Sequence, residues 1–130
     1  MNILVVDDSN TLRFVMVKLL RELGYRDITA VGSAEEAATL VSNNSYDCIL
    51  LDWNLPKMSG LDFLRLLRSG TSTEKLPVVM VTTVNEKSNI LLALKTGIQG
   101  YLFKPVQREA LSSKLAEIAS KQSPAAGEPA

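Results

Sequence analysis

The amino-acid sequence predicts an α/β fold, a doubly wound parallel sheet built from five strand–helix pairs. Five short apolar runs alternate along the chain with segments in which apolar residues recur at helical spacing. Runs such as residues 48–51 and 78–81 contain no polar residue, which is typical of strands that are covered on both faces. Strict alternation of strands and helices implies a parallel sheet with helices on each side.

The first pair covers the amino-terminal part of the chain. The apolar run at residues 3–6 predicts a strand that ends at Asp7-Asp8. Ser9 and Asn10 are good candidates for a helix cap, and Gly24 supplies the stop. The apolar residues in between recur at helical spacing, so we expect them to face the core: Leu12, Val15, Met16, Leu19, Leu20 and Leu23.

Two other apolar residues of this helix, Phe14 and Val17, lie three apart and outside that stripe. Polar residues would be expected at such positions. Two interpretations stay open. The residues belong to a widened core face or are scattered surface apolars, or they form a docking patch for a partner helix.

The next two pairs follow the same scheme. Residues 27–31 predict a short strand, and Ser33, with two acids in the following turn, opens the second helix. Residues 48–51 predict a buried strand that ends at Asp52. The third helix is expected over residues 59–68, with these candidates for the core: Leu61, Phe63, Leu64 and Leu67.

The last two pairs complete the fold. The strand at 78–81 precedes a helix at about 85–95, whose apolar periodicity is the weakest of the five. A strand at 101–103 precedes a helix at 107–121, whose core residues are expected to be Leu111, Leu115 and Ile118. Residues 122–130 contain no large apolar side chain, so we expect a disordered tail there.

The composition narrows the class of protein. A chain of 130 residues with 46% hydrophobic residues is expected to form one domain, here over residues 1–121. Lys plus Arg and Asp plus Glu number 14 each, so nucleic acid and anionic membranes are not expected partners. Cys48 is the only cysteine and there is no histidine, which excludes an internal disulfide and a structural zinc site. With no signal peptide or long apolar segment, we expect a cytoplasmic monomer.

Four of the apolar runs end in side chains that can do chemistry. Asp7 and Asp8 follow the first run, Asp52 the third, Thr82 the fourth and Lys104 the fifth. Ligands of open parallel sheets bind outside the carboxyl ends of the strands, and the flavodoxin-like strand order 2-1-3-4-5 places the ends of strands one and three side by side. We therefore expect these residues to converge on one site.

Several carboxylates in one place repel each other unless a cation neutralises them. A set of oxygen ligands suits Mg²⁺. The plainer alternative is that Asp7 and Asp8 only cap the first helix, but their coincidence with Asp52 and Lys104 favours a site. Beside a divalent ion and an ammonium group, Asp52 could act as a nucleophile toward phosphorus without a general base.

The motifs that carry these residues resemble the receiver domains of two-component response regulators, most of all the stand-alone chemotaxis regulators. The resemblance covers the chain to about Ser120. It rests on four motifs in order: Val5-Val6-Asp7-Asp8, Leu51-Asp52-Trp53-Asn54-Leu55-Pro56, Met80-Val81-Thr82 and Gly100-Tyr101-Leu102-Phe103-Lys104-Pro105.

The resemblance implies that Asp52 accepts a phosphoryl group from the phosphohistidine of a sensor histidine kinase or a histidine phosphotransfer protein. Lys104 and Thr82 would contact the phosphoryl oxygens, Tyr101 would be an aromatic switch that turns inward, and the bond before Pro105 would be cis. The implied Mg²⁺ ligands are Asp7, Asp8, Asp52 and the backbone carbonyl of Asn54.

The resemblance also implies how a signal leaves the domain. The helix at 85–95, the strand at 101–103 and the last helix would form the partner surface. Our candidates on it are Lys87, Ile90, Leu91, Tyr101 and Lys114. The output would be contact with a downstream protein such as the flagellar motor switch, or onward transfer of the phosphoryl group, and no catalysis beyond the domain's own phosphorylation and dephosphorylation.

One departure from the family pattern is informative. Val84 stands where chemotaxis regulators carry a glutamate that helps to orient water, so we expect slower hydrolysis of the acyl phosphate.

Three other functions fit the site residues less well. An aspartate-nucleophile phosphatase would need a second acid where Asn54 stands, a flavin module would be repelled by Asp7-Asp8, and a docking module that no longer takes phosphate would not need the complete set of site residues.

Overall fold

The computed structural model describes residues 1–122 and arranges five parallel strands in one sheet of order β2-β1-β3-β4-β5. This confirms the predicted fold class and strand order. The strands are β1 (Asn2–Val6), β2 (Asp27–Val31), β3 (Cys48–Leu51), β4 (Val78–Thr82) and β5 (Gly100–Phe103). The helices are α1 (Asn10–Glu22), α2 (Ala34–Asn43), α3 (Gly60–Ser69), α4 (Lys87–Thr96) and α5 (Arg108–Gln122).

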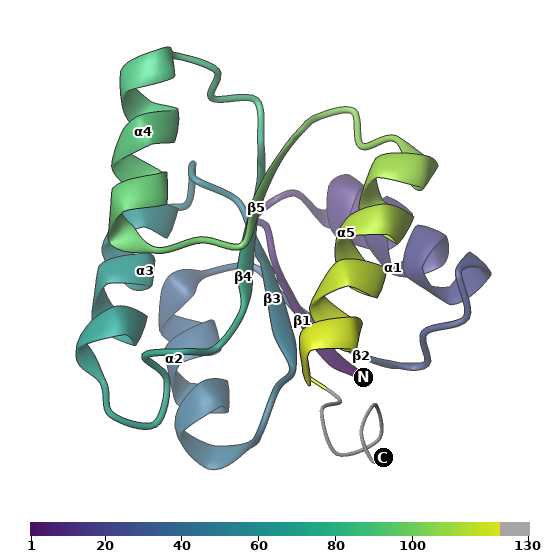
Figure 1. Cartoon of the computed structure of the whole chain (residues 1–130), viewed down its shortest axis with the longest axis horizontal. Coiled ribbons are helices and arrows are strands. Elements are labelled where there is room, and N and C mark those ends of the chain that lie inside the picture. The colour runs from purple at the N-terminus through teal and green to yellow at the C-terminus, as the bar shows by residue number, and fades with distance from the viewer. Residues whose placement is uncertain (123–130) are drawn as a thin grey trace.

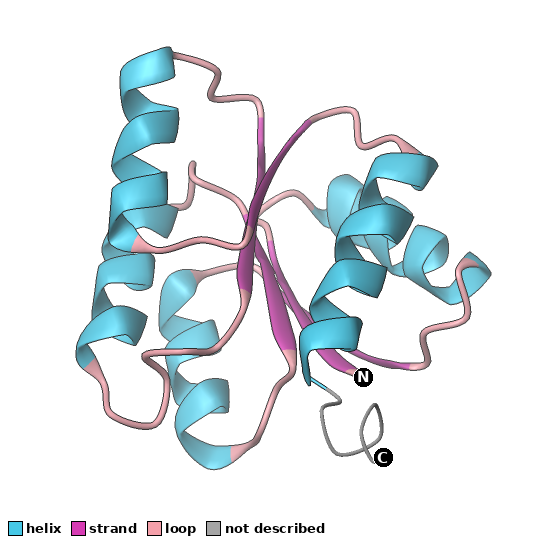
Figure 2. Cartoon of the chain, in the orientation of Figure 1, coloured by secondary structure: helices cyan, strands magenta, loops and turns pink. Residues whose placement is uncertain are grey.

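The helices form one layer on each side of the sheet. Figure 1 shows α2, α3 and α4 on one side of the strands and α1 and α5 on the other, and Figure 2 shows the same layers by secondary structure. Alternate residues of each strand enter opposite layers: Leu4 and Val6 pack toward α2 and α3, whereas Ile3 and Val5 pack toward α1 and α5. The sheet is therefore buried on both faces.

Serine side chains begin three of the helices, as predicted. The hydroxyl of Ser9 accepts the Leu12 amide at 3.2 Å, and Ser33 and Ser59 make the equivalent bonds for α2 and α3. Gly24 follows α1 with a φ of 100°, a left-handed conformation that glycine adopts without strain. The helix ends are thus set by local chemistry.

The apolar stripe of α1 is narrower than its spacing predicts. Met16 and Leu20 are buried, but Leu12 is 40% exposed and Val15 is 50% exposed, so the prediction that both face the core is wrong. The reason is their place: they lie at the margin where α1 meets the loop before α5, and they line a cavity of about 130 Å³ with Pro105 and Val106. The sheet covers only the strip around Met16 and Leu20.

The interpretation of Phe14 as part of a widened core face is also wrong. Phe14 is 70% exposed and Val17 is half-buried, and both line a shallow depression on the outer side of α1. Whether these residues are scattered surface apolars or a docking patch stays open.

Helix α4 begins at Lys87, two residues later than expected, and its N-cap residue Glu86 makes no capping bond with its side chain. Ala93 is its one buried residue.

The last helix, α5, includes Gln122, which lies one residue beyond the predicted domain boundary. Residues 123–130 of the predicted tail lie outside the described residues. No helix in the described part of the chain is both long enough and apolar enough to span a bilayer.

The buried cysteine gives a test of the core. Cys48 has no exposed surface, and burial raises the pKa of its thiol to about 12. An unfolded thiol has a pKa near 8.5, so at pH 8 a disulfide reagent should react with the native thiol at least about a thousandfold more slowly than with the urea-unfolded chain. Stopped-flow absorbance measures both rates, and full modification of native protein within seconds would contradict the structure.

Candidate functional site

Two carboxylates lie side by side at the carboxyl ends of β1 and β3. Asp7 and Asp52 each continue the sheet for one residue, because the Asp7 amide donates to Val31 O at 3.1 Å and the Asp52 amide to Val6 O at 3.0 Å. Both are buried, whereas Asp8 is exposed. One carboxylate oxygen from each of the three residues lies within 4.8 Å of the others.

The Lys104 ammonium joins the two buried acids. Its Nζ donates to Asp7 Oδ2 at 2.6 Å and to Asp52 Oδ2 at 2.8 Å. Burial alone would lower the pKa of Lys104, but the hydrogen bonds and charges of Asp52 and Asp7 outweigh it and raise the pKa above its usual value. The amine therefore stays charged at neutral pH, and three carboxylates against one ammonium leave an excess of negative charge.

Backbone amides hold the other oxygens of the two buried acids. Asp7 Oδ1 accepts the Ser9 amide at 2.9 Å, and Asp52 Oδ1 accepts the Asn54 amide at 3.3 Å. Each carboxylate is thus fixed between an amide and Lys104, while exposed Asp8 faces solvent. An excess of negative charge, oxygen donors only and an open side fit a hydrated Mg²⁺ ion.

A glycine lets α3 begin directly against the loop that carries Asp52. The Gly60 amide donates to Trp53 O at 2.8 Å, and a Cβ on Gly60 would lie 2.1 Å from the Asp52 carbonyl oxygen. No side chain fits there. Gly60 was not among the site residues expected from the sequence, although its place between the Ser59 cap and the first helical turn was visible.

The Val84 backbone connects Thr82 to Tyr101. Buried Thr82 accepts the Val84 amide on Oγ1 at 3.3 Å, and the Tyr101 hydroxyl donates to Val84 O at 2.6 Å. Burial raises the pKa of the Tyr101 phenol, and the charges of Glu86 and Asp52 raise it further. The Tyr101 ring is therefore turned toward the loop between β4 and α4. The Lys104–Pro105 peptide bond is cis.

The structure places the candidate partner residues on α4, β5 and α5. Lys87 and Leu91 are exposed, and Ile90, Tyr101 and Lys114 are half-buried. Leu94 was not among the residues predicted for this surface, although it lies seven residues after Lys87 and is 52% exposed. Residues spaced by three, four and seven share one face of a helix, so its spacing from Lys87 was the signal for it.

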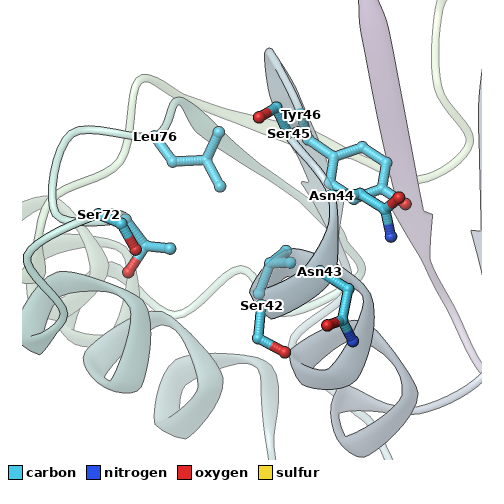
Figure 3. Close-up of a pocket in the computed structure, with 9 residues that line it drawn as sticks. Ser42, Asn43, Asn44, Ser45, Tyr46, Ser72 and Leu76 are labelled. Carbon is cyan, nitrogen blue, oxygen red and sulfur yellow. The ribbon is translucent and has the colours of Figure 1, made fainter.

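Another depression, shown in Figure 3, lies at the opposite end of the sheet. Its walls come from the loops that precede β3 and β4, including Asn44 and Thr73. Their side chains are engaged with helix carbonyls, Asn44 with Leu40 at 3.1 Å and Thr73 with Leu67 at 2.6 Å. These groups are already bonded within the chain, so the acidic cluster at the other end is the candidate site.

A family match, sequence relatives and a solved structure all relate this chain to receiver domains. Residues 3–116 match the family of response regulator receiver domains. The chemotaxis protein CheY1 of Helicobacter pylori is 37% identical over 88% of this chain and 94% of its own, and the chemotaxis protein CheY of Pseudomonas aeruginosa is 35% identical over 91% and 95%. The receiver domain of a sensor histidine kinase from Pseudomonas aeruginosa, solved with a magnesium ion coordinated in its active-site cleft, has a TM-score of 0.82 and 30% identity over 91% of this chain and 97% of its own.

The position of Lys104 predicts a large effect on stability. Lys104→Met keeps the length of the side chain but leaves two buried carboxylates facing each other, so the free energy of unfolding at pH 7 should fall by about 3–5 kcal/mol. Urea denaturation followed by circular dichroism measures this. The matched variant Lys95→Met, at an exposed position of α4, should change it by less than about 0.5 kcal/mol. Equal effects of the two substitutions would contradict the assigned ion pairs.

Proposed function

Because this chain belongs to the response regulator receiver domain family, we propose that it carries a signal by accepting a phosphoryl group on Asp52. The observation that supports this most directly is the placement of the Lys104 ammonium 2.8 Å from Asp52 Oδ2, beside two further carboxylates. Aspartate is a nucleophile in its ionised form, and the ammonium can pair with a phosphoryl oxygen.

The proposed step is a displacement at phosphorus. An oxygen of Asp52 attacks the phosphorus of a phosphohistidine, the bond from phosphorus to the imidazole nitrogen breaks, and that nitrogen keeps the electron pair. Lys104 then holds a phosphoryl oxygen, and the buried Thr82 hydroxyl is the donor from the neighbouring strand. The donor would be a sensor histidine kinase or a histidine phosphotransfer protein, as the resemblance implies.

The residues that would hold Mg²⁺ are Asp7, Asp8 and Asp52, with the carbonyl of Asn54 as a fourth ligand. When bound, the ion would neutralise charge on the carboxylates and on the transferred group. Of the three carboxylates, Asp8 is the one that is exposed.

The backbone on either side of the Val84 Cα would carry the response to the partner surface. A Thr82 hydroxyl that turns toward a phosphoryl oxygen must leave the Val84 amide, and the Val84 carbonyl holds the Tyr101 hydroxyl. The helix that follows, α4, has no side-chain cap and few buried residues, so it can shift at small cost. We propose that the changed surface comprises Lys87, Ile90, Leu91, Tyr101 and Lys114.

A chemotaxis-type role in the cytoplasm is favoured, because relatives that match almost the whole chain are chemotaxis proteins. The downstream partner would then be a protein such as the flagellar motor switch.

A shuttle that passes the phosphoryl group to another histidine is the alternative function. An aspartate-nucleophile phosphatase is not favoured, since Asn54 cannot protonate a leaving group. We propose a domain over residues 1–121 that catalyses only its own phosphorylation and dephosphorylation.

Phosphorylation can be tested without the natural kinase. With acetyl phosphate and Mg²⁺, the intact mass of the chain should increase by one phosphoryl group, and Trp53 fluorescence should change because Trp53 adjoins Asp52. Asp52→Asn should abolish both changes. Phosphorylation that persists in Asp52→Asn, or its complete absence in the wild type, would contradict the proposal.

The lifetime of the acyl phosphate is a separate prediction. Val84 presents an apolar side chain next to the site and cannot orient an attacking water. Val84→Glu should therefore speed dephosphorylation by up to about a hundredfold, the lower end of what a positioned acid–base group contributes. Loss of phosphorylated mass after donor removal measures the rate. Val84→Leu is the matched control and should leave it nearly unchanged, and an equal or slower rate in Val84→Glu would refute the idea.

A further inference from the structure

Phe103 lies beside both residues of the proposed switch. It is the last residue of β5, and its partner in the β4–β5 register is Thr82. Tyr101 is two positions earlier on the same strand, so the three side chains share one face of the sheet. Thr82 is fully buried, whereas Phe103 is 50% exposed at the edge of the site.

The rings of Tyr101 and Phe103 are in contact. Their centroids are 5.4 Å apart and their planes are inclined by 57°. This lies within the range in which tilted aromatic pairs attract each other beyond the burial of their surface. The next residue along the strand is Lys104, whose ammonium is fixed between Asp7 and Asp52. Phe103 therefore sits on backbone that is anchored immediately after it.

Tyr101 is consequently held at two points. Its hydroxyl donates to Val84 O at 2.6 Å, and its ring rests against Phe103. If the Tyr101 side chain rotates outward, it must lose the hydrogen bond and the ring contact together. The first contact depends on the loop after β4, which Thr82 also holds, and the second depends only on β5.

We propose that Phe103 is a positioning residue for Tyr101, whose ring contact sets how much of the protein has Tyr101 turned inward. The meaning of that position for signalling rests on the proposed function, but the contact does not. An aromatic pair of this geometry should favour the inward position about two- to twelvefold over a chain that lacks the Phe103 ring.

The experiment uses the full chain labelled with 3-fluorotyrosine and follows ¹⁹F resonances at neutral pH. The three tyrosines give three signals, and Tyr101→Phe identifies the one of interest. In Phe103→Ala, the Tyr101 signal should move toward that of an exposed fluorotyrosine, and in Phe103→Leu, which keeps an apolar cover without a ring, it should move in the same direction. Phe103→Trp supplies an aromatic ring without adding a fourth fluorotyrosine, and it should return the signal to its wild-type position. Phe14→Ala removes an exposed aromatic ring far along α1 and should change nothing.

The inference is overturned if the Tyr101 signal stays in its wild-type position in Phe103→Ala while circular dichroism shows a folded chain. If that variant does not fold, Phe103→Leu decides in the same way. Acetyl phosphate is added only afterwards. A shifted Tyr101 signal in a chain that does not gain a phosphoryl group would support the role of Phe103 and refute the proposed function. An unmoved signal in a chain that does gain the group would do the reverse.

Discussion

The charge balance at the carboxyl edge of the sheet is the constraint on which the rest of this molecule depends. Lys104 reaches two carboxylates that come from distant parts of the chain, Asp7 after β1 and Asp52 after β3. The ion pairs join the end of β5 to the ends of two inner strands. A buried pair of acids would not be tolerated without that ammonium, because uncompensated charge in a low-dielectric site is very unfavourable.

The same arrangement leaves the site with an excess of negative charge. One lysine opposes three acids, and Asp8, the exposed acid of the three, is accessible to a hydrated ion. Such a site is suited to binding a cation, because the cation would neutralise the excess negative charge of the carboxylates. Stability and function therefore act in opposite directions at this edge, which is common where charged groups are gathered for chemistry.

The path from the site to the surface is short and consists largely of backbone. Thr82 and Tyr101 both bind the backbone of Val84: Thr82 accepts its amide, and the Tyr101 hydroxyl donates to its carbonyl. In α4, the helix that follows, Ala93 alone is buried, whereas α1 and α2 each bury two residues and α3 buries five. A few hydrogen bonds can shift such an element, because little packing opposes its movement.

The sequence by itself determined the fold class and the strand order, and it predicted that Asp7, Asp52 and Lys104 lie together at one edge of the sheet. It could do so because apolar runs mark buried strands, and the carboxyl ends of parallel strands meet at one edge of the sheet. The tertiary structure alone decided which parts of each helix lie over the sheet. Leu12 and Val15 have helical spacing suited to a core, yet they lie at the margin of the sheet and stay largely exposed. It also decided the late start of α4, the link through Val84 and the contact of Tyr101 with Phe103, because these depend on how a loop settles against a neighbouring strand, and no local pattern in the chain records that.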